Sequence, residues 1–232
     1  MPASLILVRY KPWLGWAGFL SMAIFRLPLL LSNQIAFWRL MGCGKNGTFD
    51  IMPDLLQWGL LLIPKENIQP VSPIVPSFIA GWWRFFGCEE YHIELSALEG
   101  HGTWNGKEVF GKYPENGSSY SGKIAVLTRA TIRLRKLSAF WKQVDQVAET
   151  MTTASGFITS VGIGEIPWVK QATFSVWESR EQMKQFAYRM REHQDVIRRT
   201  RQEKWYSEEM FVRFAIISTR GTLRGVDPIS TT

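Results

Sequence analysis

One stretch of the chain combines a histidine with a run of arginines. Residues 181–204 repeat apolar positions at steps of three and four, which predicts a single amphipathic helix. The positions that share this face are Met183, Phe186, Ala187, Met190, Ile197 and Thr200. His193 falls on the same face, and Ser179 followed by Gln182 has the spacing of a capping box that begins a helix.

An inward histidine on such a helix supports two interpretations. In the first, His193 is the axial ligand of a heme iron, and Arg198 or Arg201 reaches a propionate group. In the second, His193 is a core histidine hydrogen-bonded to backbone, and the arginines form a solvated basic face. Because buried histidines are common, the spacing by itself favours the second interpretation.

Four apolar or aromatic residues accompany this candidate ligand. Phe186 and Met190 lie on the same helical face and are candidates to line a substrate pocket. Trp205 and Tyr206 are expected to end the helix, where they either border that pocket or cap the core. No nucleophile or general base stands out, so no catalytic side chain is predicted.

Other charged or titratable residues are ambiguous. Arg129 and Arg133 share one face of a predicted strand, so they either line a polar cavity or meet solvent. His101 lies in a glycine-flanked, turn-like segment and is expected at the surface. His92 opens a predicted strand and has no evident partner.

Composition and missing motifs exclude several classes. The net charge of +7 favours an anionic partner, and the absence of RNP, zinc-finger or helix-turn-helix patterns argues against nucleic acid. Cys43 and Cys88 are the only cysteines, which favours a reducing compartment without disulfides. There is no HExxH, P-loop, dinucleotide fingerprint or Ser-His-Asp order, so hydrolase, metalloprotease and nucleotide-dependent functions are not expected.

Residues 13–31 are the only candidate for a membrane segment. Arg26 and Pro28 interrupt the apolar run, which leaves too short a segment to span a bilayer. We expect a core helix ending near Pro28, with shallow attachment to a membrane surface through Trp and Phe as the alternative. No signal-peptide cleavage site follows, so the expected location is cytoplasmic or peripheral at the inner face of a membrane.

The two halves of the chain repeat one another. Residues 42–45 match residues 162–165 at an offset of 120, and residues 102–106 match residues 221–225 at an offset of 119. Each half also has the order β-α-β-β-α-β of a ferredoxin-like unit. The sequence therefore predicts an α+β fold of tandem ferredoxin-like repeats that form a pseudo-dimeric α/β barrel.

These patterns also predict the elements and the domain boundaries. The predicted strands are 5–9, 35–40, 55–63, 91–98, 123–132, 157–163, 172–177 and 210–217. The predicted helices are 14–27, 77–86, 137–151 and 181–204. The predicted divisions are a first repeat at 1–111 with a Pro-rich insertion at 64–76, a linker at 112–122, a second repeat at 123–225 and a tail at 226–232.

Several long runs resemble the spheroidene monooxygenase family of carotenoid biosynthesis. The runs are AVLTRATIR (125–133), SVGIGEIPWVKQATFSVW (160–177), the segment 186–214, FWRLMGCGKNGTF (37–49) and HGTWNGKEVF (101–110). The likeness spans nearly the whole chain and is densest between residues 123 and 228. It departs most at residues 64–88, which carry closely spaced prolines.

The resemblance implies an oxygenase that uses molecular oxygen to form a hydroxyl and then a keto group at the end of an acyclic carotenoid. It further implies heme b, with His193 at the position of the axial ligand, and the dimeric α/β-barrel fold. A separate protein such as a ferredoxin would supply electrons. Three alternatives remain: a cofactor-free oxygenase, another heme oxidoreductase such as a dehydratase or peroxidase, and a non-enzymatic protein that binds heme or an apolar ligand.

Overall fold

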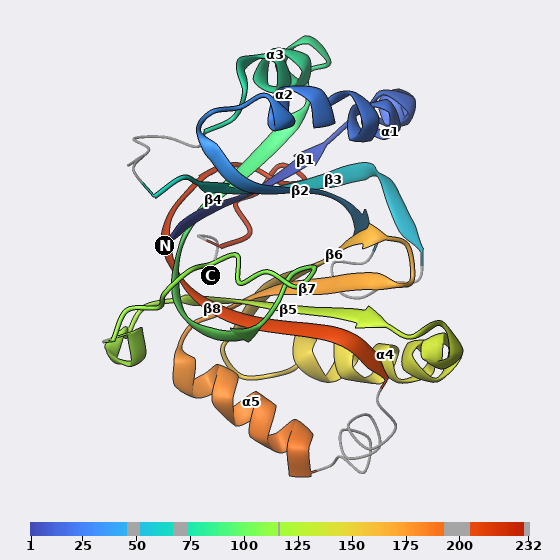
Figure 1. Ribbon diagram of the computed structural model, residues 1–232. Coiled ribbons are helices and arrows are strands. Elements are labelled where there is room, and N and C mark those ends of the chain that lie inside the picture. Colours follow the sequence, from blue (N-terminus) through green and yellow to red (C-terminus); the bar gives the residue numbers. More distant parts are fainter. Residues whose placement is uncertain (46–51, 67–73, 116, 193–204, 230–232) are drawn as a thin grey trace.

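Eight strands form one closed barrel in the computed structural model of the chain (Figure 1). The structure describes residues 1–45, 52–66, 74–115, 117–192 and 205–229. The strands are β1 (Pro2–Arg9), β2 (Ile35–Gly44), β3 (Pro53–Pro64), β4 (Glu89–Gly102), β5 (Ile124–Ile132), β6 (Phe157–Ile166), β7 (Lys170–Trp177) and β8 (Tyr206–Gly221). The helices are α1 (Gly15–Ile24), α2 (Arg26–Leu30), α3 (Ser77–Phe85), α4 (Leu137–Thr152) and α5 (Arg180–Glu192), with 3-10 turns η1 (Pro12–Leu14), η2 (Gly117–Ser119) and η3 (Leu134–Lys136).

The barrel consists of two ferredoxin-like units joined edge to edge. The first unit has the strand order β4-β1-β3-β2 and the second has the equivalent order β8-β5-β7-β6. Antiparallel pairing of β2 with β6 and of β4 with β8 closes the barrel. The predicted fold class is thereby confirmed, whereas the exact boundaries of the repeats, linker and tail stay a prediction.

The pairing of β4 with β8 follows the predicted duplication. Tyr91 pairs with Gly221, and Gly102 pairs with Met210. Tyr91 and Met210 are 119 residues apart, and so are Gly102 and Gly221, so the two pairs are equivalent. A twofold relation between the halves requires this equivalence. The glycines that reveal the repeat in the sequence thus occupy equivalent ends of equivalent strands.

Several strands are longer than the sequence pattern predicted. β4 continues to Gly102, so His101 belongs to a strand and the prediction of a turn there was wrong. β6 continues to Ile166, beyond the end of the strand predicted at 157–163. In both places polar residues and glycines interrupt the apolar alternation, but the neighbouring strand still pairs with the backbone.

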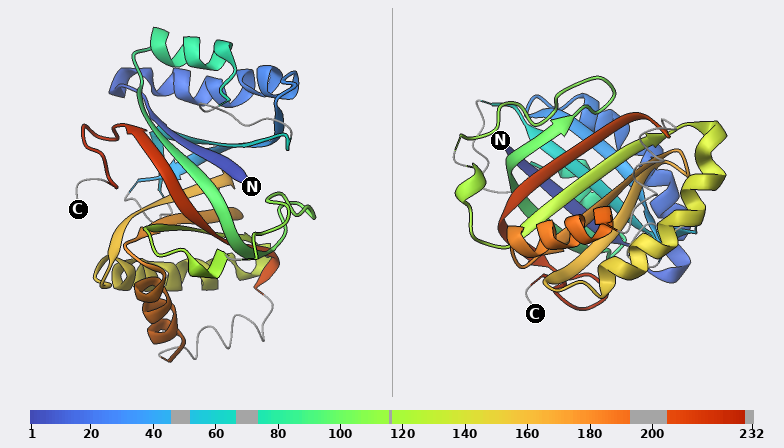
Figure 2. Two further views of the ribbon diagram at one scale, coloured as in Figure 1. Left: turned by 90° about the vertical axis from the view of Figure 1, so that its left-hand side faces the viewer. Right: turned by 90° about the horizontal axis from the view of Figure 1, so that it is seen from below.

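The helices form two layers on opposite sides of the barrel. Helices α1, α2 and α3 cover the first unit, and α4 and α5 lie against the second (Figures 1 and 2). The lumen between the layers is a cluster of buried apolar side chains that every strand of the barrel contributes to. Alternate residues of each strand therefore point inward to this cluster or outward to a helix layer.

The apolar segment near the N-terminus differs from its prediction as a core helix ending near Pro28. The helix breaks at Phe25 and continues through Pro28 to Leu30, because Pro28 falls in the first turn of α2, where the missing N–H matters least. Four buried residues, Ala17, Ser21, Phe25 and Leu29, recur at steps of four, and Gly18 is buried beside the first of them. Length and composition would allow Pro12–Leu30 to cross a membrane, but 28% of its most apolar window is buried, along the face that packs on the barrel.

Candidate cofactor and substrate site

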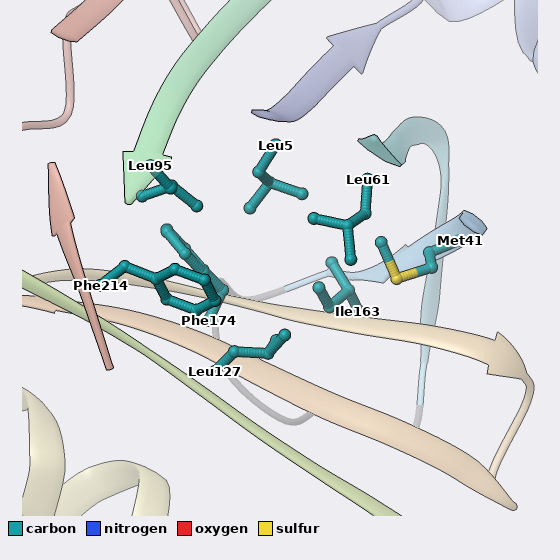
Figure 3. A pocket seen from close by; sticks show the side chains of 8 residues that line it. All are labelled: Leu5, Met41, Leu61, Leu95, Leu127, Ile163, Phe174 and Phe214. Atoms are coloured by element: carbon teal, nitrogen blue, oxygen red, sulfur yellow. The ribbon is translucent and has the colours of Figure 1, made fainter. Parts of the chain in front are cut away.

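The barrel lumen has no room for a large ligand. Side chains from all eight strands converge there and fill the interior (Figure 3). These side chains are Leu5, Met41, Leu61, Leu95, Leu127, Ile163, Phe174 and Phe214. The space left among them accommodates about one water molecule, so neither a porphyrin nor a polyene fits inside the barrel.

The outer face of the second unit differs from its counterpart in the first. In the first unit Val8 pairs with Trp58 and Ile6 pairs with Leu60, and these side chains pack beneath α1 and α3. The equivalent pairs in the second unit are Thr128 with Thr173 and Val126 with Ser175. Small hydroxyl side chains thus replace large apolar ones on the outward face of the second unit.

We name this surface the Thr128 face and define it by Thr128 on β5, Thr173 and Ser175 on β7, and Phe211 and Arg213 on β8. Thr128 is exposed although its strand has neighbours on both sides. The Thr173 hydroxyl is buried and has no hydrogen-bond partner within the described part of the chain. An uncovered central strand beside an unsatisfied buried donor is typical of a site that receives a ligand.

A basic rim borders the Thr128 face where α5 begins. Arg180 donates to Glu99 at 2.7 Å and to the Gly117 carbonyl at 2.6 Å, and Arg213 donates to the same Glu99 carboxylate. Burial raises the pKa of Glu99, but Arg213 and Arg180 more than offset this and lower it below its ordinary value. Two guanidinium groups share one carboxylate, so the rim keeps a net positive charge that suits an anionic group. Neither arginine could be predicted from its spacing, because neither lies near the candidate histidine in the chain.

Helix α5 begins as the sequence predicted. The Gln182 N–H donates to the Ser179 hydroxyl at 3.2 Å, which confirms Ser179 as the cap, and that hydroxyl donates to the Gln182 side chain at 3.3 Å. Met183 is buried, and the Phe186 ring lies 5.1 Å from the Trp177 ring. From there α5 runs away from the barrel toward its C-terminal end (Figure 1).

The remaining predicted site residues divide into two groups. His193, Arg198 and Arg201 lie outside the described residues, as does the side chain of Met190. Trp205 is 3% exposed and packs in a cluster with Ile132, Phe140 and Trp141. Tyr206 opens β8 and does not end a helix, because its backbone is paired with Ile132 of β5. Burial, with a contribution from Glu209, raises the pKa of Tyr206 to about 12.

The two histidines in the described residues have different surroundings. His92 is buried, and its Nε2 lies 2.9 Å from the Glu90 carboxylate. His101 is exposed, as expected, but it stacks on Phe211 with ring centroids 5.6 Å apart. His101 on β4 pairs with Phe211 on β8, and Phe211 pairs with Thr128 on β5. His101 therefore lies in the same row across the strands as Thr128 and borders the Thr128 face.

Arg129 meets neither solvent nor a free cavity. It is 2% exposed, and its guanidinium lies 2.7 Å from Glu208 and 3.2 Å from Glu165, with the Trp104 ring 4.9 Å away. Neither expectation, that Arg129 lines a polar cavity or that it meets solvent, describes this arginine, because carboxylates from β6 and β8 pair with it. Arg133 lies just beyond the end of β5, where it is exposed and donates to the Tyr206 carbonyl at 3.3 Å.

Glu208 links Arg129 to the turn after β4. Its carboxylate accepts from the Thr103 hydroxyl and from the Gly106 N–H, each at 2.8 Å. Burial raises the pKa of Glu208, but the Gly106 N–H and Arg129 outweigh burial and hold it at about 2. Glu89 binds Thr222 and Gly225 in the same way in the other half. Glu89 and Glu208 are 119 residues apart, so the repeat offset was the signal that could have found this pair.

The closed barrel of two ferredoxin-like units, with helices on its outer faces, defines an α+β protein of the dimeric α/β-barrel class. The structure of an aldoxime dehydratase, OxdRE, shares this fold with a TM-score of 0.60 at 10% identity, covering 93% of this chain and 79% of that chain. A domain of unknown function, DUF3291, matches residues 123–216.

Similarity to characterised proteins extends over nearly the whole chain. The spheroidene monooxygenase of Rhodobacter capsulatus is 30% identical over 233 residues, covering 98% of this chain and 95% of that protein. The spheroidene monooxygenase of Cereibacter sphaeroides is 31% identical over 210 residues, covering 90% of this chain and 64% of that protein. The chain belongs to the spheroidene monooxygenase family, and it is a monooxygenase.

Proposed function

We propose that the protein is a heme-dependent monooxygenase that introduces oxygen, first as a hydroxyl and then as a keto group, at the end of an acyclic carotenoid. The relatives are named for activity on spheroidene, which supports a carotenoid substrate. The observation that carries the proposal for the cofactor is the Thr128 face, where small side chains replace the large apolar ones of the equivalent surface.

The residues around this face fit a heme group. Thr128, Thr173 and Ser175 have smaller side chains than their counterparts in the first unit, so a flat ring would meet less bulk against this sheet, and Phe211 offers an apolar wall. Arg180 and Arg213 carry one more positive charge than Glu99 neutralises, which suits a propionate. His193 is proposed as the axial ligand, with Arg198 and Arg201 as further propionate partners, since it follows directly after the described part of α5.

A heme bound here would supply the oxygen activation that side chains by themselves lack. The chain has three tasks of its own. Trp177 on β7 contacts Phe186 on α5, and the two rings exclude water from one side of the site. The Thr173 hydroxyl, which is buried and has no partner among the described residues, can donate a hydrogen bond to an oxygen atom placed beside it. Arg180 and Arg213 orient the bound group through its carboxylates.

Insertion of one oxygen atom from molecular oxygen also requires two electrons from outside the substrate. We propose a separate donor protein of the ferredoxin class, because the sequence carries no flavin or iron-sulfur motif. The alternatives have less support. A cofactor-free oxygenase acting on an apolar substrate would leave the positive charge of Arg180 and Arg213 without an anionic ligand group. A purely binding function does not agree with membership of a monooxygenase family.

The test is an absorbance spectrum of the protein purified from heme-supplemented cells. We expect a Soret band in the wild type that is lost or shifted in His193→Ala. His101→Ala is the matched control, because His101 is exposed beside the same face and should leave the band unchanged. A band that survives in His193→Ala but disappears in His101→Ala would assign the ligand to His101. The absence of a band in the wild type would rule out the heme mechanism. Carotenoid turnover with a ferredoxin system then tests the reaction.

A further inference from the structure

The helix layer over the first unit leaves a large apolar surface uncovered. Nine side chains of this layer are 42% to 83% exposed. They are Trp13, Trp16, Phe19, Leu20, Leu27, Leu30, Leu31, Phe78 and Phe85, and we name them the docking face. Soluble proteins seldom expose this many large apolar side chains together unless the surface binds something. We propose that this face binds the surface of an anionic lipid bilayer.

Ring contacts connect the parts of the docking face that α1 and α3 contribute. The Trp16 ring on α1 contacts Phe86, which follows α3, at a centroid distance of 5.8 Å. Phe86 in turn contacts Phe85 at 5.0 Å and Trp82 at 4.8 Å. Trp82 lies 6.3 Å from Phe78. These ring contacts join α1 and α3 into a single aromatic surface, with the inner faces of the same helices packed on the barrel.

The charges around this surface suit anionic lipid headgroups. Lys11, Arg26 and Arg84 are exposed at its margins. Residues 11–31 and 77–86 contain no Asp or Glu at all. Exposed Trp and Phe together with basic residues are typical of helices that lie in the plane of a membrane interface, where the rings enter the acyl boundary and the cations meet phosphates.

The same charges argue against a second copy of this chain as the occupant. A symmetric dimer through the docking face would bring the cations of both copies together, and these helices offer no carboxylate to pair with them. A membrane-spanning arrangement also disagrees with the fold, since Ala17, Phe25 and Leu29 are buried against the barrel. Peripheral binding satisfies both constraints.

Docking in this way would orient the enzyme. The docking face and the layer of α4 and α5 lie on opposite sides of the barrel (Figures 1 and 2). With α1–α3 on the bilayer, the α4 and α5 side faces the aqueous phase and stays accessible to soluble partners. This inference is independent of the cofactor, because it rests on the other side of the molecule.

The first experiment is flotation of the full-length protein with vesicles of phosphatidylcholine containing phosphatidylglycerol. We expect binding to these vesicles and about tenfold weaker binding to phosphatidylcholine alone. The triple variant Trp13→Ser, Trp16→Ser, Phe19→Ser should bind the anionic vesicles at least about tenfold more weakly. The control triple variant Leu134→Ser, Ile217→Ser, Val226→Ser removes side chains that are similarly exposed elsewhere and should bind like the wild type. Thermal melts must show that both variants stay folded.

A second variant tests the charges. Arg26→Glu with Arg84→Glu should weaken binding to the anionic vesicles, whereas Lys107→Glu with Arg220→Glu, which reverses two exposed charges outside the face, should not. Failure of the folded wild type to bind vesicles, equal binding to both compositions, or resistance to extraction with alkaline carbonate would each overturn the proposal. So would a dimer in solution, detected by light scattering, that the Trp13–Trp16–Phe19 variant abolishes.

Discussion

At the scale of single residues, the buried Arg129 shows how a charge becomes part of the structure. A guanidinium that is 2% exposed would be very costly without partners, and Glu208 and Glu165 supply them. Glu208 also binds the turn of residues 103–106, so one carboxylate connects β8, β5 and the end of β4. This connection makes the stability of the barrel depend on the ionisation of Glu208.

The first prediction concerns that ionisation. The pKa of Glu208 is about 2 in the folded protein, below the ordinary value of 4.5, so its contribution to stability is complete above pH 4.5. That contribution is lost as the pH falls from 4.5 to about 2. We expect Glu208→Gln to lower the free energy of unfolding by roughly 3 kcal/mol at pH 7 and by much less near pH 2. Urea unfolding at several pH values measures this.

The matched control for this prediction is Glu181→Gln, which neutralises an exposed carboxylate at the start of α5. It should change stability little at any pH. Equal pH profiles for Glu208→Gln and the wild type would show that the Glu208 ion pairs do not stabilise the fold.

At the scale of elements, strand ends depend on glycines at close approaches. Gly102 ends β4 at a φ of +88°, and a Cβ there would lie 2.1 Å from the Glu209 carbonyl oxygen. Gly221 ends β8 at a φ of +92°, where a Cβ would lie 2.1 Å from the Glu90 carbonyl oxygen. Both positions therefore exclude any side chain, because the partner strand occupies its place.

The second prediction compares two glycines of one turn. Gly102→Ala should destabilise the protein by roughly 3 kcal/mol or more, since it combines backbone strain with a clash against backbone. Gly106→Ala should cost only about 1–2 kcal/mol, because Gly106 has a φ of +74° but no atom within 4 Å of the added Cβ. Thermal unfolding of both variants gives the comparison. Similar melting temperatures would show that β4 and β8 separate easily at this point.

The third prediction concerns the Thr128 face. Ser175→Leu places on β7 the residue that Leu60 supplies at the equivalent position of β3. Ser175 is buried and accepts a hydrogen bond from Trp177 Nε1 at 3.0 Å, so the added volume should displace the Trp177 ring and lower heme binding at least about tenfold while the fold is retained. Heme titration with circular dichroism measures both. Ser218→Leu, on the exposed surface of β8, is the control and should bind like the wild type. Unchanged binding by Ser175→Leu would place any heme elsewhere.

At the scale of the whole molecule, the two units share one core. The lumen cluster takes side chains from strands of both halves, and the barrel closes only through β2 with β6 and β4 with β8. A separated half would expose its two edge strands and one side of this cluster to water. The repeats are therefore equivalent in topology but interdependent in stability.

The fourth prediction follows from this shared core. Residues 1–111 and 112–232, expressed separately, should be unfolded or self-associated, because neither half can bury its share of the lumen. Expressed together, they should form a one-to-one complex with the circular dichroism spectrum of the intact chain. Size-exclusion chromatography with light scattering checks this outcome. A folded monomer formed by either half would contradict it and would establish the predicted repeats as independent domains.

The fold could be predicted from the sequence because its signals are local or periodic. Alternation in 123–132, the step-three and step-four pattern of α4 and α5, and the matched glycine motifs each identify an element or a repeat without any knowledge of contacts. The capping box at Ser179 is equally local, since its two hydrogen bonds lie within one turn. The ends of β4 and β6 were misjudged because pairing with a neighbouring strand, which no local pattern reports, decides where a strand ends.

The candidate site depended on contacts between distant segments. The sequence by itself determined the residue types, the duplication and the family, and it named His193 as a candidate ligand. Only the tertiary structure decided that the lumen is full, that Thr128 is uncovered and that Arg180 and Arg213 meet at Glu99. It also decided that one face of 12–30 packs on the barrel and the other does not. Burial and the choice of hydrogen-bond or ion-pair partners are properties of the assembled barrel, because both depend on contacts between residues that lie far apart in the chain.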